Sequence, residues 1–156
     1  MPYIIDGNNV MGQTPGWHRD KPRARLELLK QLTAFARLRC ARVTVAFDGA
    51  PDQEFPEGTA YKGIQILYAR KGSNADERII ELVESSRDPR GLIVVTSDRQ
   101  LGFRVRQRGA TVLRSGELRK QMTAIADSKR PPATEAEPDA DDLEGWLRYF
   151  GADADD

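Results

Sequence analysis

Five short apolar runs, separated by longer segments with helical periodicity, set the strongest limit on what this chain can fold into. The runs lie at residues 3–5, 43–47, 61–68, 92–95 and 111–113. Most are nearly continuous in apolar residues, as strands are when helices cover both faces of a parallel sheet. The sequence therefore predicts an α/β fold, a three-layer sandwich with a mostly parallel central sheet.

The segments between these runs predict the helices. The first helix is expected over about residues 23–40, because its apolar residues recur on one face. That face is formed by Leu28, Leu29, Leu32, Phe35, Ala36 and Cys40. Its last member, Cys40, is expected to be a small core residue rather than a reactive thiol. Further helices are expected after Asn74, over residues 99–108 as far as Gly109, and around Leu118.

The charge of the chain is divided unevenly along its length. The 156 residues fit one domain, and their formal net charge is zero. Residues 131–156 hold nine acidic side chains and one arginine, so this part carries −8 and residues 1–130 carry +8. A basic body suits a polyanionic partner, although ordinary solvated surface accounts for the same charge equally well.

The C-terminal part of the chain differs from the rest in composition. We expect a domain over residues 1–129, a linker rich in Pro, Ala and acids over residues 130–142, and a short amphipathic helix with an acidic tail over residues 143–156. No apolar run approaches the length of a membrane span, and no signal peptide is visible. A cytoplasmic protein without a membrane partner is therefore expected, and its oligomeric state stays open.

Several carboxylates follow the predicted strands. Asp6, Asp48 and Asp98 follow three of them, while Asp76 and Glu77 open the helix after the third. Singly, each fits a turn or a helix cap equally well. Jointly, the carboxyl ends of parallel strands bring them to one edge of the sheet, where they repel unless a cation lies among them. The chain has one Cys and one His, so oxygen ligands and a hard ion, Mg²⁺ or Mn²⁺, are expected.

Four motifs in order carry a resemblance to a known family. Residues 4–12 are IIDGNNVMG, 45–48 are VAFD, 74–79 are NADERI and 95–98 are VTSD. Over roughly residues 3–125 the chain resembles the YacP-like NYN domain proteins of the PIN and flap-endonuclease-like nuclease superfamily. The resemblance implies a metal-dependent endoribonuclease that hydrolyses phosphodiester bonds in single-stranded RNA during RNA turnover.

Carried over position by position, the resemblance assigns the site residues. Asp6, Asp76 and Asp98 are implied as catalytic metal-binding carboxylates, and Asn9 as the polar residue that fixes the pocket. Glu77 and Asp48 are implied as further metal-binding members. The implied partner is RNA, and whether it is ribosome-bound mRNA or free RNA stays open.

The basic residues near this pocket predict how RNA is held. Candidates for RNA-phosphate binding are Arg70, Lys71, Arg99 and Arg104. Trp17, in the loop of residues 12–22, is expected to cover the core locally, and base stacking is the alternative. Two rival functions are a catalytically idle RNA-binding module acting in RNA processing and a phospho-receiver domain. The receiver fits poorly, because Asp6 stands alone after its strand.

Overall fold

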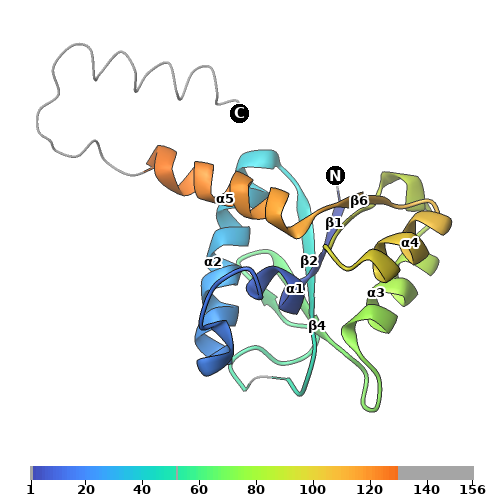
Figure 1. The fold of residues 1–156 in the computed structure, drawn as a ribbon, viewed down its shortest axis with the longest axis horizontal. Coiled ribbons are helices and arrows are strands. Elements are labelled where there is room, and N and C mark those ends of the chain that lie inside the picture. Colours follow the sequence, from blue (N-terminus) through green and yellow to red (C-terminus); the bar gives the residue numbers. More distant parts are fainter. Residues whose placement is uncertain (1, 52, 130–156) are drawn as a thin grey trace, which may run out of the picture. The chain divides into compact units, whose positions relative to one another are not determined.

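The computed structural model describes residues 2–51 and 53–129, which form a mixed α/β fold around a six-stranded sheet (Figure 1). The strand order is β3-β4-β2-β1-β5-β6, and every pairing is parallel except that of β3 with β4. The strands are β1 (Pro2–Asp6), β2 (Arg42–Phe47), β3 (Ala60–Tyr61), β4 (Ile64–Tyr68), β5 (Ile93–Val95) and β6 (Thr111–Leu113). The predicted fold class is confirmed.

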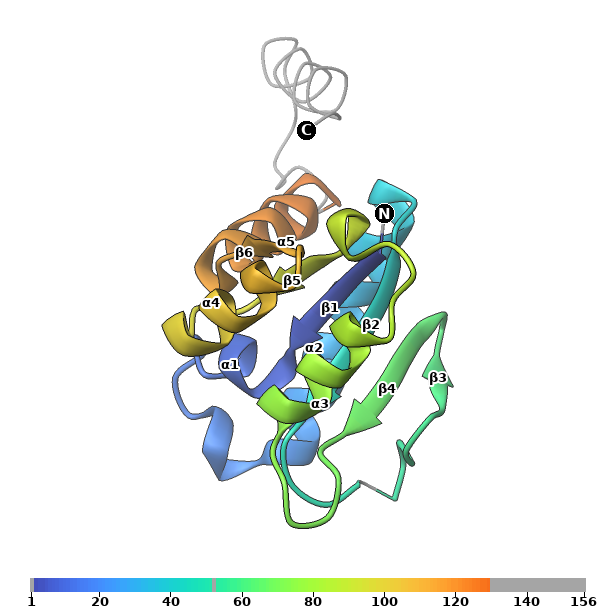
Figure 2. The same cartoon turned by 90° about the vertical axis from the view of Figure 1, so that its right-hand side faces the viewer.

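Helices cover both faces of this sheet, as Figures 1 and 2 show. The helices are α1 (Gly7–Met11), α2 (Lys21–Arg39), α3 (Ala75–Glu84), α4 (Arg99–Gln107) and α5 (Ser115–Lys129), with short 3₁₀ turns η1 (Trp17–Arg19) and η2 (Pro89–Gly91). Helices α1 and α2 lie on one side of the sheet, and α3 and α4 lie on the other. The parallel strands are therefore buried on both faces, as their apolar composition requires.

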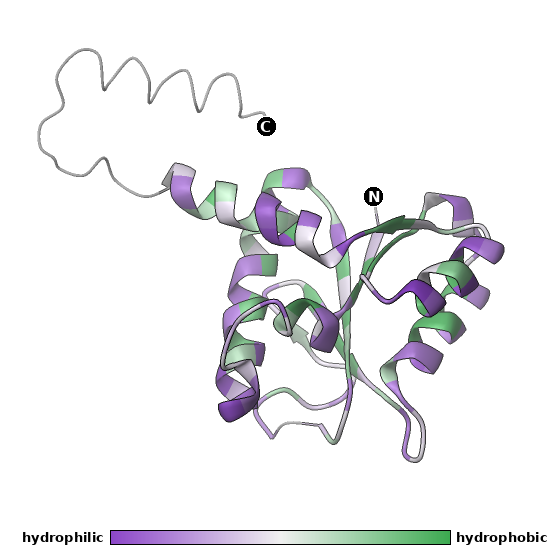
Figure 3. Ribbon diagram, in the orientation of Figure 1, coloured by the Kyte–Doolittle hydropathy of each residue, from purple (hydrophilic) through white to green (hydrophobic). Residues whose placement is uncertain are grey.

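The alternation of side chains along β1 connects the sheet to both layers. Ile4 belongs to a buried cluster with Ile79 of α3 and Leu101 of α4. Tyr3 points the other way and packs edge-on against Phe35 of α2, with 5.1 Å between ring centroids. The green segments of Figure 3 mark these apolar strands and inner helix faces. Since successive side chains alternate, Asp6 continues the Ile4 side of the strand, toward α3 and α4.

The chain divides into two compact units, Met1–Met122 and Thr123–Asp156. The first contains the whole sheet and helices α1 to α4. The predicted linker of residues 130–142 and the predicted helix of residues 143–156 lie outside the described residues. In the parts of the chain that are described, no helix is long and apolar enough to cross a membrane.

Two local predictions are wrong for backbone reasons. The single strand expected over residues 61–68 is a hairpin, because Lys62 and Gly63 have φ values of 48° and 92°; positive φ at both central residues is typical of a tight hairpin turn. Cys40 is exposed rather than buried. It ends α2 with φ 51° and ψ 45°, so the helical spacing that predicted its burial stops one residue before it.

Candidate functional site

The carboxyl ends of β1, β2 and β5 lie side by side at one edge of the sheet. Asp6 pairs with Ala46 of β2, and Ile5 pairs with Val95 of β5. Asp48 and Asp98 therefore follow the strands that flank Asp6. Strand β1 is also where the strand order reverses, since the chain proceeds from it to β2 on one side and later to β5 and β6 on the other. Ligands of open α/β sheets bind at such a position.

Asp6 is the most buried of these carboxylates, with 4% of its surface exposed. Thr96 donates its hydroxyl to Asp6 Oδ2 at 2.8 Å. Burial nevertheless raises the pKa of Asp6 to about 7, and the negative charges of Asp76 and Asp48 add to the rise. An ionised Asp6 is therefore held at a cost that a neighbouring positive charge would relieve.

Asp76 joins this group from the first turn of α3. Asn74 caps that helix by accepting a hydrogen bond from the backbone N–H of Glu77 at 2.9 Å, which places Asp76 at the sheet edge. Burial raises the pKa of Asp76, and the charges of Asp98, Asp48 and Glu77 raise it further. Four of the acids that the sequence predicted to meet are thus close enough for their charges to raise the pKa of Asp6 and Asp76. We call Asp6, Asp48, Asp76 and Asp98 the aspartate cluster.

Asp48 and Asp98 also hold backbone in place. Asp48 Oδ1 accepts a hydrogen bond from the N–H of Ala75 at 2.7 Å, which ties the end of β2 to the start of α3. Asp98 Oδ1 caps α4 by accepting from the N–H groups of Gln100 and Leu101 at 2.9 and 3.2 Å. For both residues, Oδ2 makes no hydrogen bond within the described part of the chain. Each can therefore support the fold and still present an oxygen to a ligand.

Asn9 organises the polar side chains beside the aspartate cluster. Its Oδ1 accepts hydrogen bonds from the N–H of Ser97 at 2.9 Å and from the hydroxyl of Ser115 at 2.6 Å. The N–H of Ser115 in turn donates to Ser97 Oγ at 3.0 Å. Asn9 thus connects α1, the end of β5 and the start of α5. Ser115 is fully buried, and the sequence analysis did not predict its place in this site. The one indication in the sequence was a serine between a predicted strand and the helix that follows it.

Asn8 has a structural role that the sequence did not indicate. Its side-chain Oδ1 accepts a hydrogen bond from the N–H of Asp48 at 2.9 Å. The Asn8 side chain therefore fixes the end of β2 next to β1, and Asn9 fixes the end of β5 on the other side.

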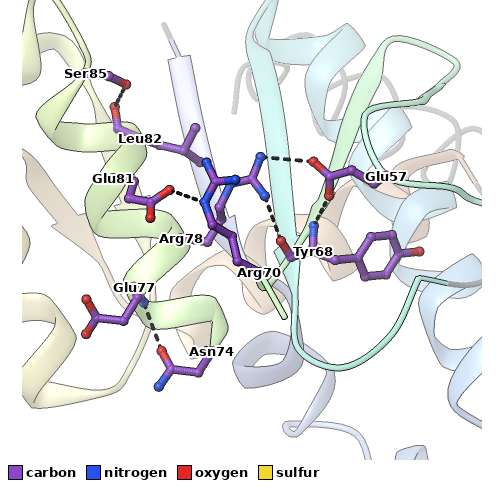
Figure 4. A network of polar contacts seen from close by, with 9 residues as sticks. All are labelled: Glu57, Tyr68, Arg70, Asn74, Glu77, Arg78, Glu81, Leu82 and Ser85. Carbon is purple, nitrogen blue, oxygen red and sulfur yellow. Dashed lines mark hydrogen bonds and ion pairs between the residues drawn. The ribbon is translucent and has the colours of Figure 1, made fainter. Parts of the chain in front are cut away.

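The predicted basic residues divide into paired and unpaired groups. Arg104 binds Glu77, with 2.7 Å between Nη1 and Oε2, and this contact lowers the pKa of Glu77. Arg70 binds Glu81 at 2.9 Å (Figure 4). Lys71 and Arg99 are exposed and make no ion pair among the described residues. The carboxylate of Glu77 is engaged by Arg104, so its role as a metal ligand stays a prediction.

The aspartate cluster is not a closed metal cage. Within residues 2–51 and 53–129, no three or more His, Cys, Asp or Glu side chains form a group that could hold a metal ion by themselves. Mg²⁺ is usually bound through one or two carboxylates, with water and substrate phosphate completing its shell. An open, all-oxygen set with mutual repulsion fits that kind of binding.

Comparison with known proteins identifies the family. The family model described as YacP-like NYN domain matches residues 3–145. The chain belongs to this family. The match extends further along the chain than the resemblance over residues 3–125 implied. The family supports a nuclease-type, RNA-related function and RNA as the substrate. No curated protein matches the chain significantly.

Two solved structures of a Bacillus subtilis protein share this fold. The crystal structure of a mutant of Rae1 (YacP) has 21% sequence identity and a TM-score of 0.67, covering 81% of this chain and 77% of that chain. The crystal structure of Rae1 (YacP) has 19% identity and a TM-score of 0.63, covering 99% of this chain and 83% of that chain. These similarities show a common NYN fold.

Asp98 both caps α4 and places a negative charge near Asp76, and two substitutions distinguish these effects on stability. Asp98→Ala is expected to lower the free energy of unfolding in EDTA by about 1 kcal/mol, since the cap of α4 is lost. Asp98→Asn keeps a good capping residue and removes a charge facing Asp76, so we expect stability equal to or above that of the parent protein. Denaturant unfolding of both variants measures this, and equal losses would contradict the capping role.

Proposed function

We propose that this protein is an endoribonuclease that uses Mg²⁺ or Mn²⁺ to hydrolyse phosphodiester bonds in single-stranded RNA, and that it acts in RNA turnover in the cytoplasm. The observation that carries the proposal is the gathering of four aspartates at one edge of the sheet, where burial and neighbouring negative charges raise the pKa of Asp6 and Asp76. Perturbed carboxylates at a strand-order reversal are typical of functional sites. Family membership adds RNA as the substrate.

The donor set indicates how an ion would be held. Asp6 and Asp76, whose ionised forms are the most disfavoured, would be its main ligands, with Asp98 and Asp48 contributing their Oδ2 atoms. Glu77 would join them only by giving up its contact with Arg104. A bound divalent ion would supply charge neutralisation at the phosphodiester and a water of lowered pKa.

The remaining residues of the site act by positioning. Thr96 donates to Asp6 Oδ2 and accepts from the N–H of Asp98 at 3.1 Å, so one hydroxyl orients two aspartates. Asn9 fixes the segments after β1 and β5 relative to each other through Ser97 and Ser115. The carboxylates are thereby held before RNA arrives, which reduces the reorganisation needed for reaction.

The direct test is cleavage of defined RNA. Purified protein is incubated with an unstructured RNA and with a duplex of the same sequence, in Mg²⁺, in Mn²⁺ or in EDTA. Internal cleavage of the single strand that requires the ion supports the proposal. RNA binding without cleavage under every condition would instead favour the idle RNA-binding module. Incubating the protein with one mRNA, first free and then on translating ribosomes, shows which form of the RNA is cut.

The net charge of +8 on residues 1–130 predicts RNA binding that weakens as the salt concentration rises. Arg99→Glu and Lys71→Glu are each expected to weaken RNA affinity several-fold at low salt, because both residues follow strands that end at the edge of the aspartate cluster and have no ion-pair partner among the described residues. Arg87→Glu and Arg90→Glu are matched controls, since both residues precede β5 and lie at the opposite edge of the sheet. Filter binding at two salt concentrations measures the effect. Equal losses at all four positions would argue against a localised RNA site.

A further inference from the structure

A cavity of about 310 Å³ opens in the first unit, on the side of the sheet that α1 and α2 cover. Its walls come from the loop between α1 and α2, from α2 itself and from the first turns of α5. Apolar side chains on its walls are Met11, Pro15, Trp17, Ala24 and Leu28. Polar side chains on its walls are Thr14, Asp20, Arg23, Glu27, Gln31 and Arg119. We call it the Trp17 cavity.

Two helices lead from the aspartate cluster to this cavity. Helix α1 begins directly after Asp6 and ends at Met11, which lines the cavity; five helical residues span about 7.5 Å. Helix α5 begins at Ser115, which is bonded to Asn9, and carries Arg119 into the cavity one turn later. Stacked nucleotides advance by about 3.4 Å each, so the length of α1 corresponds to about two or three nucleotides.

The walls of the Trp17 cavity fit a nucleobase better than a phosphate. The carboxylates of Asp20 and Glu27 balance the guanidinium charges of Arg23 and Arg119, so the walls have no net positive charge for a phosphate. These side chains offer both hydrogen-bond acceptors and donors, as the edge of a base requires. Arg119 donates to Gln31 Oε1 at 3.3 Å, and this pair brings both donors and an acceptor to the wall shared by α5 and α2. The half-buried indole of Trp17 adds the aromatic surface on which bases stack.

We propose that the Trp17 cavity binds a base of the RNA a short distance from the bond that is cleaved. This inference rests on the proposed function, because it takes RNA as the ligand. It assigns Trp17 a binding role in place of the expected local cover over the core, and it makes the cavity a source of sequence preference. Lys21, whose ammonium lies 5.8 Å from the centre of the Trp17 ring, helps to hold the indole in place.

The test compares RNA with and without bases. Fluorescently labelled hexamers, one of adenylates and one with abasic ribose phosphates, are titrated into Asp6→Asn protein with Mn²⁺, so that the RNA stays intact. We expect the adenylate hexamer to bind about tenfold tighter. Adding Trp17→Leu, which removes the aromatic surface, should abolish this difference and leave the affinity for the abasic hexamer unchanged.

A second variant guards against misfolding. Ala24→Leu keeps Trp17 and fills the cavity from α2, so it should have the same effect on the base-dependent part of binding. Tyr61→Leu is the matched control, because it removes a half-buried aromatic ring from β3 at the outer edge of the sheet.

The outcomes distinguish this inference from the proposed function. If Asp6→Asn protein with an unaltered cavity binds both hexamers equally, or if the cavity variants weaken both equally, the cavity is not a base site. The proposal of metal-dependent cleavage is not affected by that result. Failure to bind either hexamer, together with no cleavage by the protein that retains Asp6, would overturn both. Equal base-dependent losses in Tyr61→Leu and Trp17→Leu would also contradict a role specific to the cavity.

Discussion

Asp6→Asn is expected to abolish metal-dependent RNA cleavage and, at the same time, to stabilise the metal-free protein at pH 8. The amide can still accept the hydrogen bond from Thr96, so the fold around it should persist. Loss of a main metal ligand is expected to reduce cleavage by on the order of 10³-fold or more. Burial, and to a lesser extent the charges of Asp76 and Asp48, raises the pKa of Asp6 to about 7, and the neutral amide carries neither cost.

The pKa of Asp6 determines how the stability difference between Asp6→Asn and the parent protein changes with pH. A carboxyl group whose pKa rises from 3.8 to about 7 on folding binds a proton more tightly in the folded state. Its contribution to stability is therefore complete below pH 3.8 and is lost as the pH rises through 7. Three pH units correspond to about 4 kcal/mol as an upper figure. The stability difference between Asp6→Asn and the parent protein should thus shift in favour of the variant between pH 5 and pH 8.

Denaturant unfolding in EDTA at both pH values measures that shift, and comparing the two proteins cancels carboxylates elsewhere in the chain. The matched variant is Asp88→Asn, which changes an exposed aspartate near η2, before β5. It should show no such shift. If Asp6→Asn is as pH-sensitive as the parent, Asp6 is not the buried group responsible. If it still cleaves RNA at the parental rate, the proposed function is wrong.

The sequence predicted the sheet edge well because strand ends follow from simple patterns. The apolar runs that precede Asp6, Asp48 and Asp98 form three adjacent strands of the parallel sheet, and the structure brings these residues together. Asn9 was carried over from the family motif, and the structure gives it bonds to Ser97 and Ser115. Parallel strands thus turn positions far apart in sequence into neighbours.

Other features depended on contacts that periodicity does not encode. The turn at Lys62 and Gly63 needs two residues with positive φ, and no apolar pattern marks it. Ser115 lies 106 residues from Asn9, with which it shares a hydrogen bond. The Trp17 cavity joins three segments, so its walls are visible only when α1, α2 and α5 are placed in space.

Gly7→Ala is expected to be among the most damaging small substitutions in the first unit. Gly7 follows Asp6 directly, and a Cβ at this position would lie 2.5 Å from two ring carbons of Phe47 and 3.0 Å from the carbonyl oxygen of Ala46. The Phe47 ring is fully buried, packs against Tyr68 and lies beneath the guanidinium of Arg25, so it has little room to move.

This crowding should displace the end of β1 that holds Asp6. We expect Gly7→Ala to lower the free energy of unfolding by about 1–3 kcal/mol, although alanine normally favours a helix over glycine. Cleavage should fall even at temperatures where the variant is folded, because catalytic groups tolerate small displacements poorly.

Gly102→Ala is the matched control. Gly102 lies inside α4, and the nearest neighbour of an added Cβ would be Val112 at 3.8 Å, an ordinary contact. It should be neutral or stabilising by about 0.5–1 kcal/mol. Equal stability of the two variants would show that the approach of β1 to Phe47 does not fix the position of Asp6.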